Sequence, residues 1–309
     1  MEVTLTMAAS FDLPLPSAEN ARTLVAPPGN GPGYWAGGPS AVVAEDGTFW
    51  LAYRLRRPVG SGRGYANVIA RSDDGEQFET VAVLDRAEFG SESLERPALV
   101  ALPDGGWRLY VSCATPGTRH WRVDALDATD PSLFDPASSK TILPGDQSSV
   151  AVKDPVVKLI DGQWHMWLCC HPLDLPDETD RMSTHYGTSE DGLDWTLHGT
   201  AMEGRPGMWD QRGARVADVW HKGNRWLAYY DGRASKTENA EERTGIAEGD
   251  APGSFAATDG SIGAFSGGKG SLRYLSAVHV PDGGVRLFYE TSRRDGAHDL
   301  RTEYVPPSR

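Results

Sequence analysis

Four acidic residues stand at the ends of strand-like segments, and they are the candidate catalytic groups of this chain. Glu95 and Asp154 lie at the starts of two apolar segments, whereas Asp231 and Glu290 follow aromatic ones. Cleavage of a glycosidic bond uses two carboxyl groups, one of which must stay protonated. We expect Asp154 and Glu95 to do acid–base or positioning work, with Glu290 or Asp231 in the second carboxyl role. An ion-pair network with Arg96 and Lys153 is the alternative for Glu95 and Asp154.

Arginines gather near the same segment ends, and their abundance bears on the ligand. A guanidinium group binds a carboxylate or a phosphate through two parallel hydrogen bonds. A sugar acid, a sugar phosphate or another carboxylated metabolite therefore fits better than a neutral glycan. Some of these arginines can instead be solvated rim residues or partners of acidic side chains. The candidate binding residues are Tyr34, Trp35, Arg54, Arg96, His120, Lys153, His171, Arg215, Arg233, Tyr274 and Arg294.

Histidines and loop tryptophans complete the candidate chemistry. His120, His171 and His185 are suited to proton transfer near neutral pH, but they lack the close spacing of metal ligands. Loop tryptophans such as Trp35 and Trp121, and also Trp209, can stack on a sugar ring. The chain has no glycine-rich dinucleotide loop, no phosphate-binding loop and no serine nucleophile elbow. We expect neither a cofactor nor a metal.

An internal repeat indicates which elements position these residues. Five segments share a junction, an apolar strand, a glycine turn and an aromatic-rich strand; their junctions are Pro39, Pro97, Pro155, Arg215 and Tyr274, about 59 residues apart. Four units also carry a second tight turn before an aromatic residue, as in Ser72–Phe78 and Ser189–Trp195. Each unit therefore reads as four antiparallel strands, and almost no helical periodicity is present.

The repeat predicts an all-β fold, namely a five-bladed β-propeller with four-stranded antiparallel blades. The whole chain, residues 1–309, forms one domain, with blades at roughly 38–94, 95–152, 153–212, 213–271 and 272–309. The last unit ends before a fourth strand, so we expect the N-terminal strand 20–27 to complete that blade and close the ring. A pair of β-sandwiches is the alternative, although equal spacing over five units favours the propeller.

Two motifs give the chain a family resemblance. The five-fold pattern, the pair Asp154-Pro155 and the turn from Ser189 to Trp195 resemble the five-bladed glycoside hydrolase superfamily, which includes the family 43 arabinanases and xylosidases and the family 32 invertase-like enzymes. The resemblance implies three carboxylates that face a central pocket, and Asp154 matches the positioning aspartate. The chain departs from the pattern at the base, where Gly38 stands, and at the acid glutamate, where Gly213-Ala214-Arg215 stands.

Composition sets the remaining limits. The net charge of −13 argues against a nucleic-acid partner, because binding a polyanion needs a basic face. The chain has no apolar run long enough to span a membrane, and its first residues lack a basic segment followed by a long apolar one, so we expect no secretory signal. Its three cysteines, Cys113, Cys169 and Cys170, lie in apolar runs and fit buried reduced thiols. We expect a cytoplasmic protein, either a monomer or a weak homo-oligomer.

These observations predict a glycoside hydrolase-like enzyme that acts on a small glycoside or sugar-like metabolite with an anionic group. The substrate would bind in a central arginine-rich pocket, and carboxylates would catalyse the reaction. Two alternatives stay open. One is a lyase, cyclase or isomerase that uses the same pocket on a carboxylated metabolite, and the other is a carbohydrate-binding propeller without catalysis. Uptake of solvent oxygen into product separates hydrolysis from the first alternative.

Overall fold

The computed structural model describes residues 13–17, 20–145, 149–258 and 271–307, and these are almost entirely strands and turns. This part of the chain contains no α-helix, and three short 3₁₀ helices interrupt its loops: Pro131–Leu133, Pro136–Ser138 and Lys236–Glu238. None of these helices is long and apolar enough to cross a bilayer. The all-β class expected from the sequence is therefore confirmed.

Three separate four-stranded antiparallel sheets follow the sequence repeat. The first contains β6 (Ala98–Ala101), β7 (Trp107–Ala114), β8 (Trp121–Ala128) and β9 (Lys140–Leu143). The second contains β10 (Val150–Ile160), β11 (Gln163–Pro172), β12 (Ser183–Ser189) and β13 (Thr196–Glu203). The third contains β14 (Ala214–Lys222), β15 (Arg225–Gly232), β16 (Arg243–Ala251) and β17 (Ser254–Ala257).

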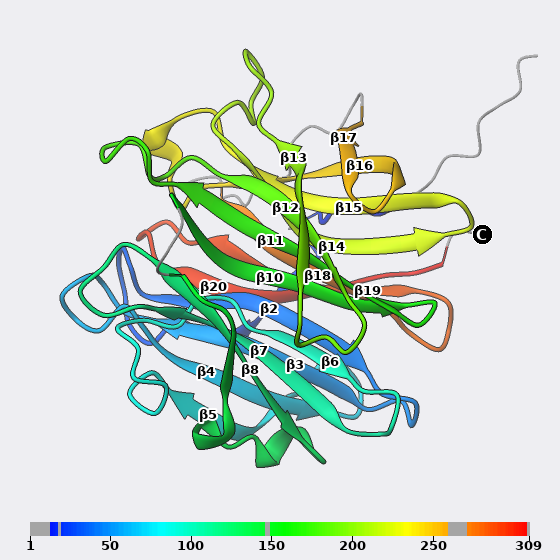
Figure 1. The fold of residues 1–309 in the computed structure, drawn as a ribbon. Coiled ribbons are helices and arrows are strands. Elements are labelled where there is room, and N and C mark those ends of the chain that lie inside the picture. The colour runs from blue at the N-terminus through cyan, green and yellow to red at the C-terminus, as the bar shows by residue number, and fades with distance from the viewer. Residues whose placement is uncertain (1–12, 18–19, 146–148, 259–270, 308–309) are drawn as a thin grey trace, which may run out of the picture.

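The two ends of the chain meet in one eight-stranded sheet. Its first half contains β2 (Trp35–Val43), β3 (Phe49–Arg56), β4 (Gly64–Ser72) and β5 (Glu79–Asp85). Its second half contains β18 (Leu272–His279), β19 (Val285–Ser292), β20 (His298–Val305) and β1 (Arg22–Val25). A single parallel pair, Trp35 with His298, joins the halves, and β1 pairs antiparallel with β20. In Figure 1, β3–β8 lie in the lower half of the molecule and β15–β17 in the upper half, with β20 between them.

Aspartate–glycine turns form the first hairpin of most units, because the second turn position needs a positive φ. Gly47, Gly105, Gly162 and Gly283 have φ values of 86°, 89°, 79° and 87°. Aromatic residues follow each turn and pack between neighbouring sheets. Trp50 and Trp107 share one core cluster, whereas Trp167 and Trp226 share another. Burial of these large rings stabilises the sheet-to-sheet contacts.

The first strand of most units bends where it approaches the centre. The pairing of β10 with β11 shifts register between Lys153 and Val156, and β18 with β19 shifts between Arg273 and Ser276. Asp154 and Tyr274 lie inside these bulges with φ values of 54° and 55°. Bulges redirect the side chains around them, and here they lie where the candidate site residues are concentrated. All three cysteines are buried and free, as expected.

Candidate functional site

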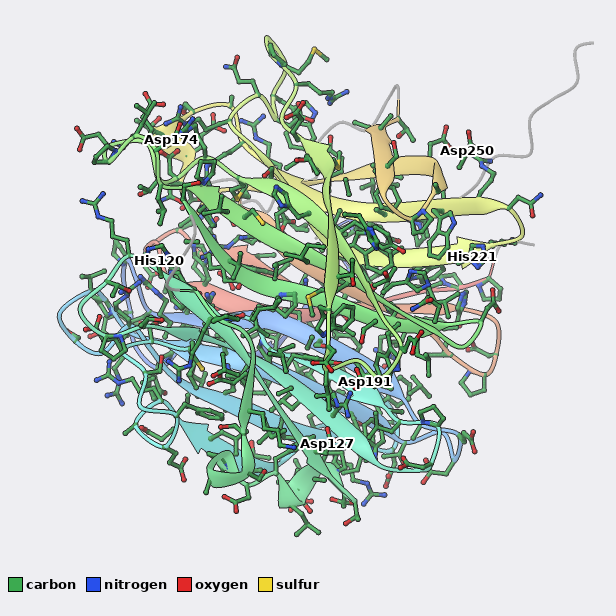
Figure 2. The ribbon with its side chains drawn as sticks, in the orientation of Figure 1. His120, Asp127, Asp174, Asp191, His221 and Asp250 are labelled. Carbon is green, nitrogen blue, oxygen red and sulfur yellow. The ribbon has the colours of Figure 1, made fainter. Side chains whose placement is uncertain are left out.

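A polar cavity of about 430 Å³ lies where the first strands of the sheets begin. Nine of the predicted site residues line it: Trp35, Arg54, Glu95, His120, Lys153, His171, Arg215, Arg233 and Tyr274. Figure 2 places His120 at the left end of the molecule, near the loop that carries Asp174. The cavity therefore gathers side chains from all the sheets.

A larger and more apolar hollow of about 1330 Å³ lies at the other end of the same first strands. His221 lines it, and Figure 2 shows this residue at the right end of the molecule. Arg96, which we expected among the binding residues, lines this hollow instead of the polar cavity. Tyr34 and Arg294 belong to neither lining. The polar cavity is the better candidate site, since it gathers titratable groups.

Three of the four candidate catalytic carboxylates lie beneath the cavity and do not line it. Asp154, Asp231 and Glu290 are each fully buried, and arginines surround them. Only Glu95 lies in the cavity wall, where it accepts a hydrogen bond from Arg54. A buried carboxylate that accepts hydrogen bonds from an arginine fixes that arginine in place.

Glu290 is the centre of the largest ion-pair cluster. Its Oε2 accepts a hydrogen bond from Arg54 at 3.0 Å, and its Oε1 accepts one from Arg273 at 2.7 Å. The ring Nδ1 of His298 lies 2.6 Å from the same Oε1. Burial alone would raise the pKa of this carboxyl, but Arg273, Arg54 and His298 hold it far below its usual range. Glu290 is therefore an ionised anchor for two arginines.

Glu242 extends this cluster, and no motif in the sequence points to it. It accepts hydrogen bonds from Arg233 and, at 2.5 Å, from Arg273, which lower the pKa of its buried carboxyl well below the usual range. Glu242 comes directly before β16, in the loop between the second and third strands of its unit. The excess of arginine over acid at the segment ends was the signal that an acidic partner was missing.

A second cluster joins Asp154, Asp231, Arg215 and Tyr274. Arg215 donates hydrogen bonds to Asp231 at 2.9 Å and to Asp154 at 3.5 Å. The Tyr274 hydroxyl donates to Asp154 Oδ2 at 3.1 Å, and the Tyr274 backbone N–H donates to Asp231 at 2.9 Å. The pKa of Asp154 falls to about 2 because Lys153 and Arg215 outweigh its burial. Burial instead raises the pKa of Asp231 against the effect of Arg215.

Several cations in the cavity wall have no carboxylate within 4 Å among the described residues. Arg56, Arg63 and Arg119 are such residues, and Lys153 reaches only Asp154, at 3.7 Å. Arg56 lies 4.0 Å from the centre of the Trp35 ring, and Arg63 lies 5.5 Å from that of Trp121. Burial and neighbouring cations lower the pKa of Arg56 to about 10. The wall therefore contains cations without a direct carboxylate partner among the described residues, although Glu95 acts on Arg56 at longer range.

Backbone strain is concentrated at the same place. Within the described part of the chain, five residues other than glycine have a positive φ: Arg63, Asp154, Asp161, Ala240 and Tyr274. Three of them line the cavity and Asp154 lies beneath it, while Asp161 lies in a hairpin turn. Such conformations cost about 1–3 kcal/mol each and are typical of functional sites.

The histidines and the loop tryptophans differ in their surroundings. The ring Nδ1–H of His171 donates a hydrogen bond to the backbone carbonyl of Thr179 at 3.1 Å, and burial with Lys153 and Arg233 nearby lowers the pKa of His171 to about 3. His185 lies outside the cavity, 3.3 Å from the Thr200 hydroxyl. Trp35 and Trp121 line the cavity, whereas Trp209 stacks on Tyr230 outside it. Across the described residues, no three His, Cys, Asp or Glu side chains group to hold a metal ion.

Comparison with known proteins identifies the fold class. No protein-family model matches the chain, and no curated protein matches it by sequence. Solved structures do match. A β-xylosidase has a TM-score of 0.67 at 15% identity, with 93% of this chain and 98% of that chain covered. The α-L-arabinofuranosidase of Lactobacillus brevis has a TM-score of 0.64 at 16% identity, with 88% and 90% covered.

A third structure agrees with these two. The endo-1,4-β-xylanase of Bacteroides thetaiotaomicron has a TM-score of 0.64 at 12% identity, with 90% of this chain and 97% of that chain covered. The chain therefore has the fold of the propeller glycoside hydrolases, as its motifs indicated. At sequence identities this low, the structural similarity shows the fold alone.

Proposed function

We propose that this chain is a glycoside hydrolase-like enzyme for a small glycoside or sugar-like metabolite that carries an anionic group. Its sheets would be the blades of a closed five-bladed propeller, with β1 as the last strand of the final blade. The observation that carries the proposal is a set of wall cations without a close carboxylate partner in the part of the chain that the structure describes: Arg56, Arg63, Arg119 and, at longer range, Lys153. A carboxylate or phosphate of the substrate would neutralise them.

Aromatic rings beside these cations would hold the sugar. Trp35 and Trp121 line the cavity, next to Arg56 and Arg63 respectively. Sugar rings stack on tryptophan through their C–H faces, while an acidic substituent needs a guanidinium or ammonium partner. One cavity wall would thus bind both parts of an anionic sugar.

Glu95 is our candidate for the carboxylate that acts as base. It lines the cavity, and Arg54 and Lys153 lower its pKa despite its burial, so that it is ionised at neutral pH. An ionised carboxylate can accept a proton from an attacking water molecule. Asp154 would be a positioning residue that holds Arg215 and Tyr274, while Glu290 and Asp231 would fix the arginines from below.

The test compares two substrates that differ only at C6, 4-nitrophenyl β-D-glucuronide and 4-nitrophenyl β-D-glucoside. We expect kcat/KM to be at least tenfold higher for the glucuronide, and binding of free D-glucuronate without binding of D-glucose in calorimetry. Equal kcat/KM values for the two substrates, or binding of neither free sugar, would overturn the proposal.

A non-hydrolytic reaction on the same anionic substrate is the second candidate. The one candidate carboxylate in the cavity wall, Glu95, has a lowered pKa, whereas hydrolysis by a carboxyl pair needs one raised pKa. Elimination needs no carboxylic acid at the leaving group. Turnover in ¹⁸O-labelled water separates the two: label in the sugar product supports hydrolysis, and an unsaturated product without label supports elimination.

A further inference from the structure

The hydroxyl of Tyr274 is the best candidate for a proton donor in the cavity, because it is protonated whereas the carboxyl groups in the cavity wall are ionised. Tyr274 lines the cavity, and only 2% of its surface is exposed. Its hydroxyl donates a hydrogen bond to Asp154 Oδ2 at 3.1 Å, which holds the phenol oxygen in place. Asp154 is itself fully buried, and it also accepts a hydrogen bond from the Arg96 backbone N–H at 3.1 Å.

Three guanidinium groups surround the Tyr274 ring. The central carbon of Arg215 lies 3.7 Å from the ring centre, and those of Arg273 and Arg54 lie 5.1 Å and 5.4 Å from it. Positive charge over an aromatic face is attracted to the ring, and it is attracted more strongly to a phenolate. These cations favour the phenolate, against the burial and the Asp154 carboxylate that raise the pKa of the hydroxyl.

The backbone at Tyr274 is held in an unusual conformation. Its φ of 55° lies in the left-handed region, which a bulky residue rarely adopts. The hydrogen bond from its N–H to Asp231 and the bulge of β18 against β19 fix this conformation. Strain of this kind persists where the position of a side chain matters.

We propose that Tyr274 is the catalytic proton donor of the cavity, with Asp154 as its positioning residue. The inference rests on the proposed function, and it supplies the acid that the carboxylates there do not provide. Burial and Asp154 raise the pKa of Tyr274 to about 12, so that the hydroxyl is protonated at neutral pH. The ammonium group of Lys153 lies 3.7 Å from Asp154 Oδ2 and adds a further positive charge beside this pair.

The Tyr274 O–H bond breaks, and its proton goes to the glycosidic oxygen as the bond from that oxygen to the anomeric carbon breaks with its electron pair. Water adds its oxygen to the anomeric carbon, and Glu95 accepts the proton that the water loses. The phenolate regains a proton from Glu95 or solvent, so that the net reaction adds one water molecule across the bond.

Tyr274→Phe tests the inference, because it removes the hydroxyl and keeps the ring among its arginines. A proton donor matters most for a poor leaving group. We expect kcat/KM to fall about 10²–10⁴-fold for phenyl β-D-glucuronide but less than tenfold for 2,4-dinitrophenyl β-D-glucuronide. Tyr110→Phe is the matched control, since the Tyr110 hydroxyl is also buried but donates to Gly192 O away from the cavity.

An equal loss on both substrates, or no loss, would overturn the role of Tyr274 while leaving the proposed function intact. A wild-type protein that does not prefer the glucuronide over the glucoside would overturn both. Should Tyr274→Phe fail to fold, as judged by circular dichroism, Asp154→Asn replaces it. That variant keeps the phenol but loses the carboxylate acceptor, and we expect a smaller defect with the same dependence on the leaving group.

Discussion

The carboxylate of Glu290 occupies the space beside Gly37 in which any side chain at position 37 would lie. A Cβ built on Gly37 would collide with Oε2 of Glu290 and come within 2.5 Å of its Cγ and Cδ atoms. The glycine lies on β2 and the glutamate on β19, in the two halves of the eight-stranded sheet. Close approach of the backbone thus allows one carboxylate to reach both Arg54 and Arg273.

Gly37→Ala should therefore destabilise the protein by displacing Glu290 from its arginines. Overpacking of a close contact costs about 1–3 kcal/mol, and a displaced buried charge adds to this. We expect a lower midpoint in urea unfolding. Because Glu290→Ala removes the colliding carboxylate, the same Gly37→Ala change should cost less in that background than in the wild-type protein.

Gly31→Ala is the control for Gly37→Ala. Gly31 has a φ of 92° but open space at its Cβ, so that its substitution introduces backbone strain without a collision. It should cost about the same with and without Glu290. Additive effects of Gly37→Ala and Glu290→Ala would contradict the collision.

The fold could be predicted from the sequence largely because its signals are local. Turn residues such as Gly47 and Gly105 and the aromatics after them, Trp50 and Trp107, recur at a fixed period, and turn chemistry acts over a few residues. The pairing of β1 with β20 joins residues almost 280 positions apart, as in Arg22 with Thr302. It was found only because the last repeat lacked a strand.

The candidate site was less predictable, because side-chain direction at a bulge is not a local property. Arg96 and Asp154 are neighbours in space, yet Arg96 lines the apolar hollow and Asp154 lies under the polar cavity. Glu242 carried no motif, and its role follows from two arginines on other segments. Periodicity identifies which residues reach the centre, but it does not say which of the two ends each one faces.

Acid should unfold the protein in a defined pH range. The folded pKa of Asp154 is about 2, below its usual 3.8, so its ionised form stabilises the folded state. That stabilisation is complete above about pH 5 and is lost as the pH falls through about 4 to 2. It amounts to about 2 kcal/mol for Asp154. Urea unfolding at pH 7, 4 and 3 should show the free energy of unfolding falling over this range.

Asp154→Asn should lower the stability at pH 7 and flatten the acid dependence between pH 4 and 2. Asp250→Asn is the control, because Asp250 is exposed (Figure 2). It should leave the stability at pH 7 and its acid dependence unchanged. An acid profile that is identical in wild type and Asp154→Asn would show that the carboxylate is not held in its ionised form.

Arg56→Gln should weaken anion binding without weakening the fold. Arg56 lines the cavity, has no carboxylate within 4 Å among the described residues, and has a pKa lowered to about 10 by burial and neighbouring cations. Loss of a charge-assisted hydrogen bond of about 1.5–3 kcal/mol should weaken D-glucuronate binding in calorimetry by roughly 10- to 100-fold. The unfolding midpoint should stay the same or rise. Arg57→Gln, an adjacent exposed change, should alter neither quantity.

His171 should remain neutral through the physiological pH range. Burial, with Lys153 and Arg233 nearby, lowers its pKa to about 3, so the imidazole ring has no positive charge between pH 5 and 8. The kcat/KM profile for the glucuronide should therefore show no inflection from His171 in that range. His120→Gln serves as the control, because His120 also lines the cavity. An inflection between pH 5.5 and 7.5 that survives in His120→Gln but disappears in His171→Gln would contradict the prediction.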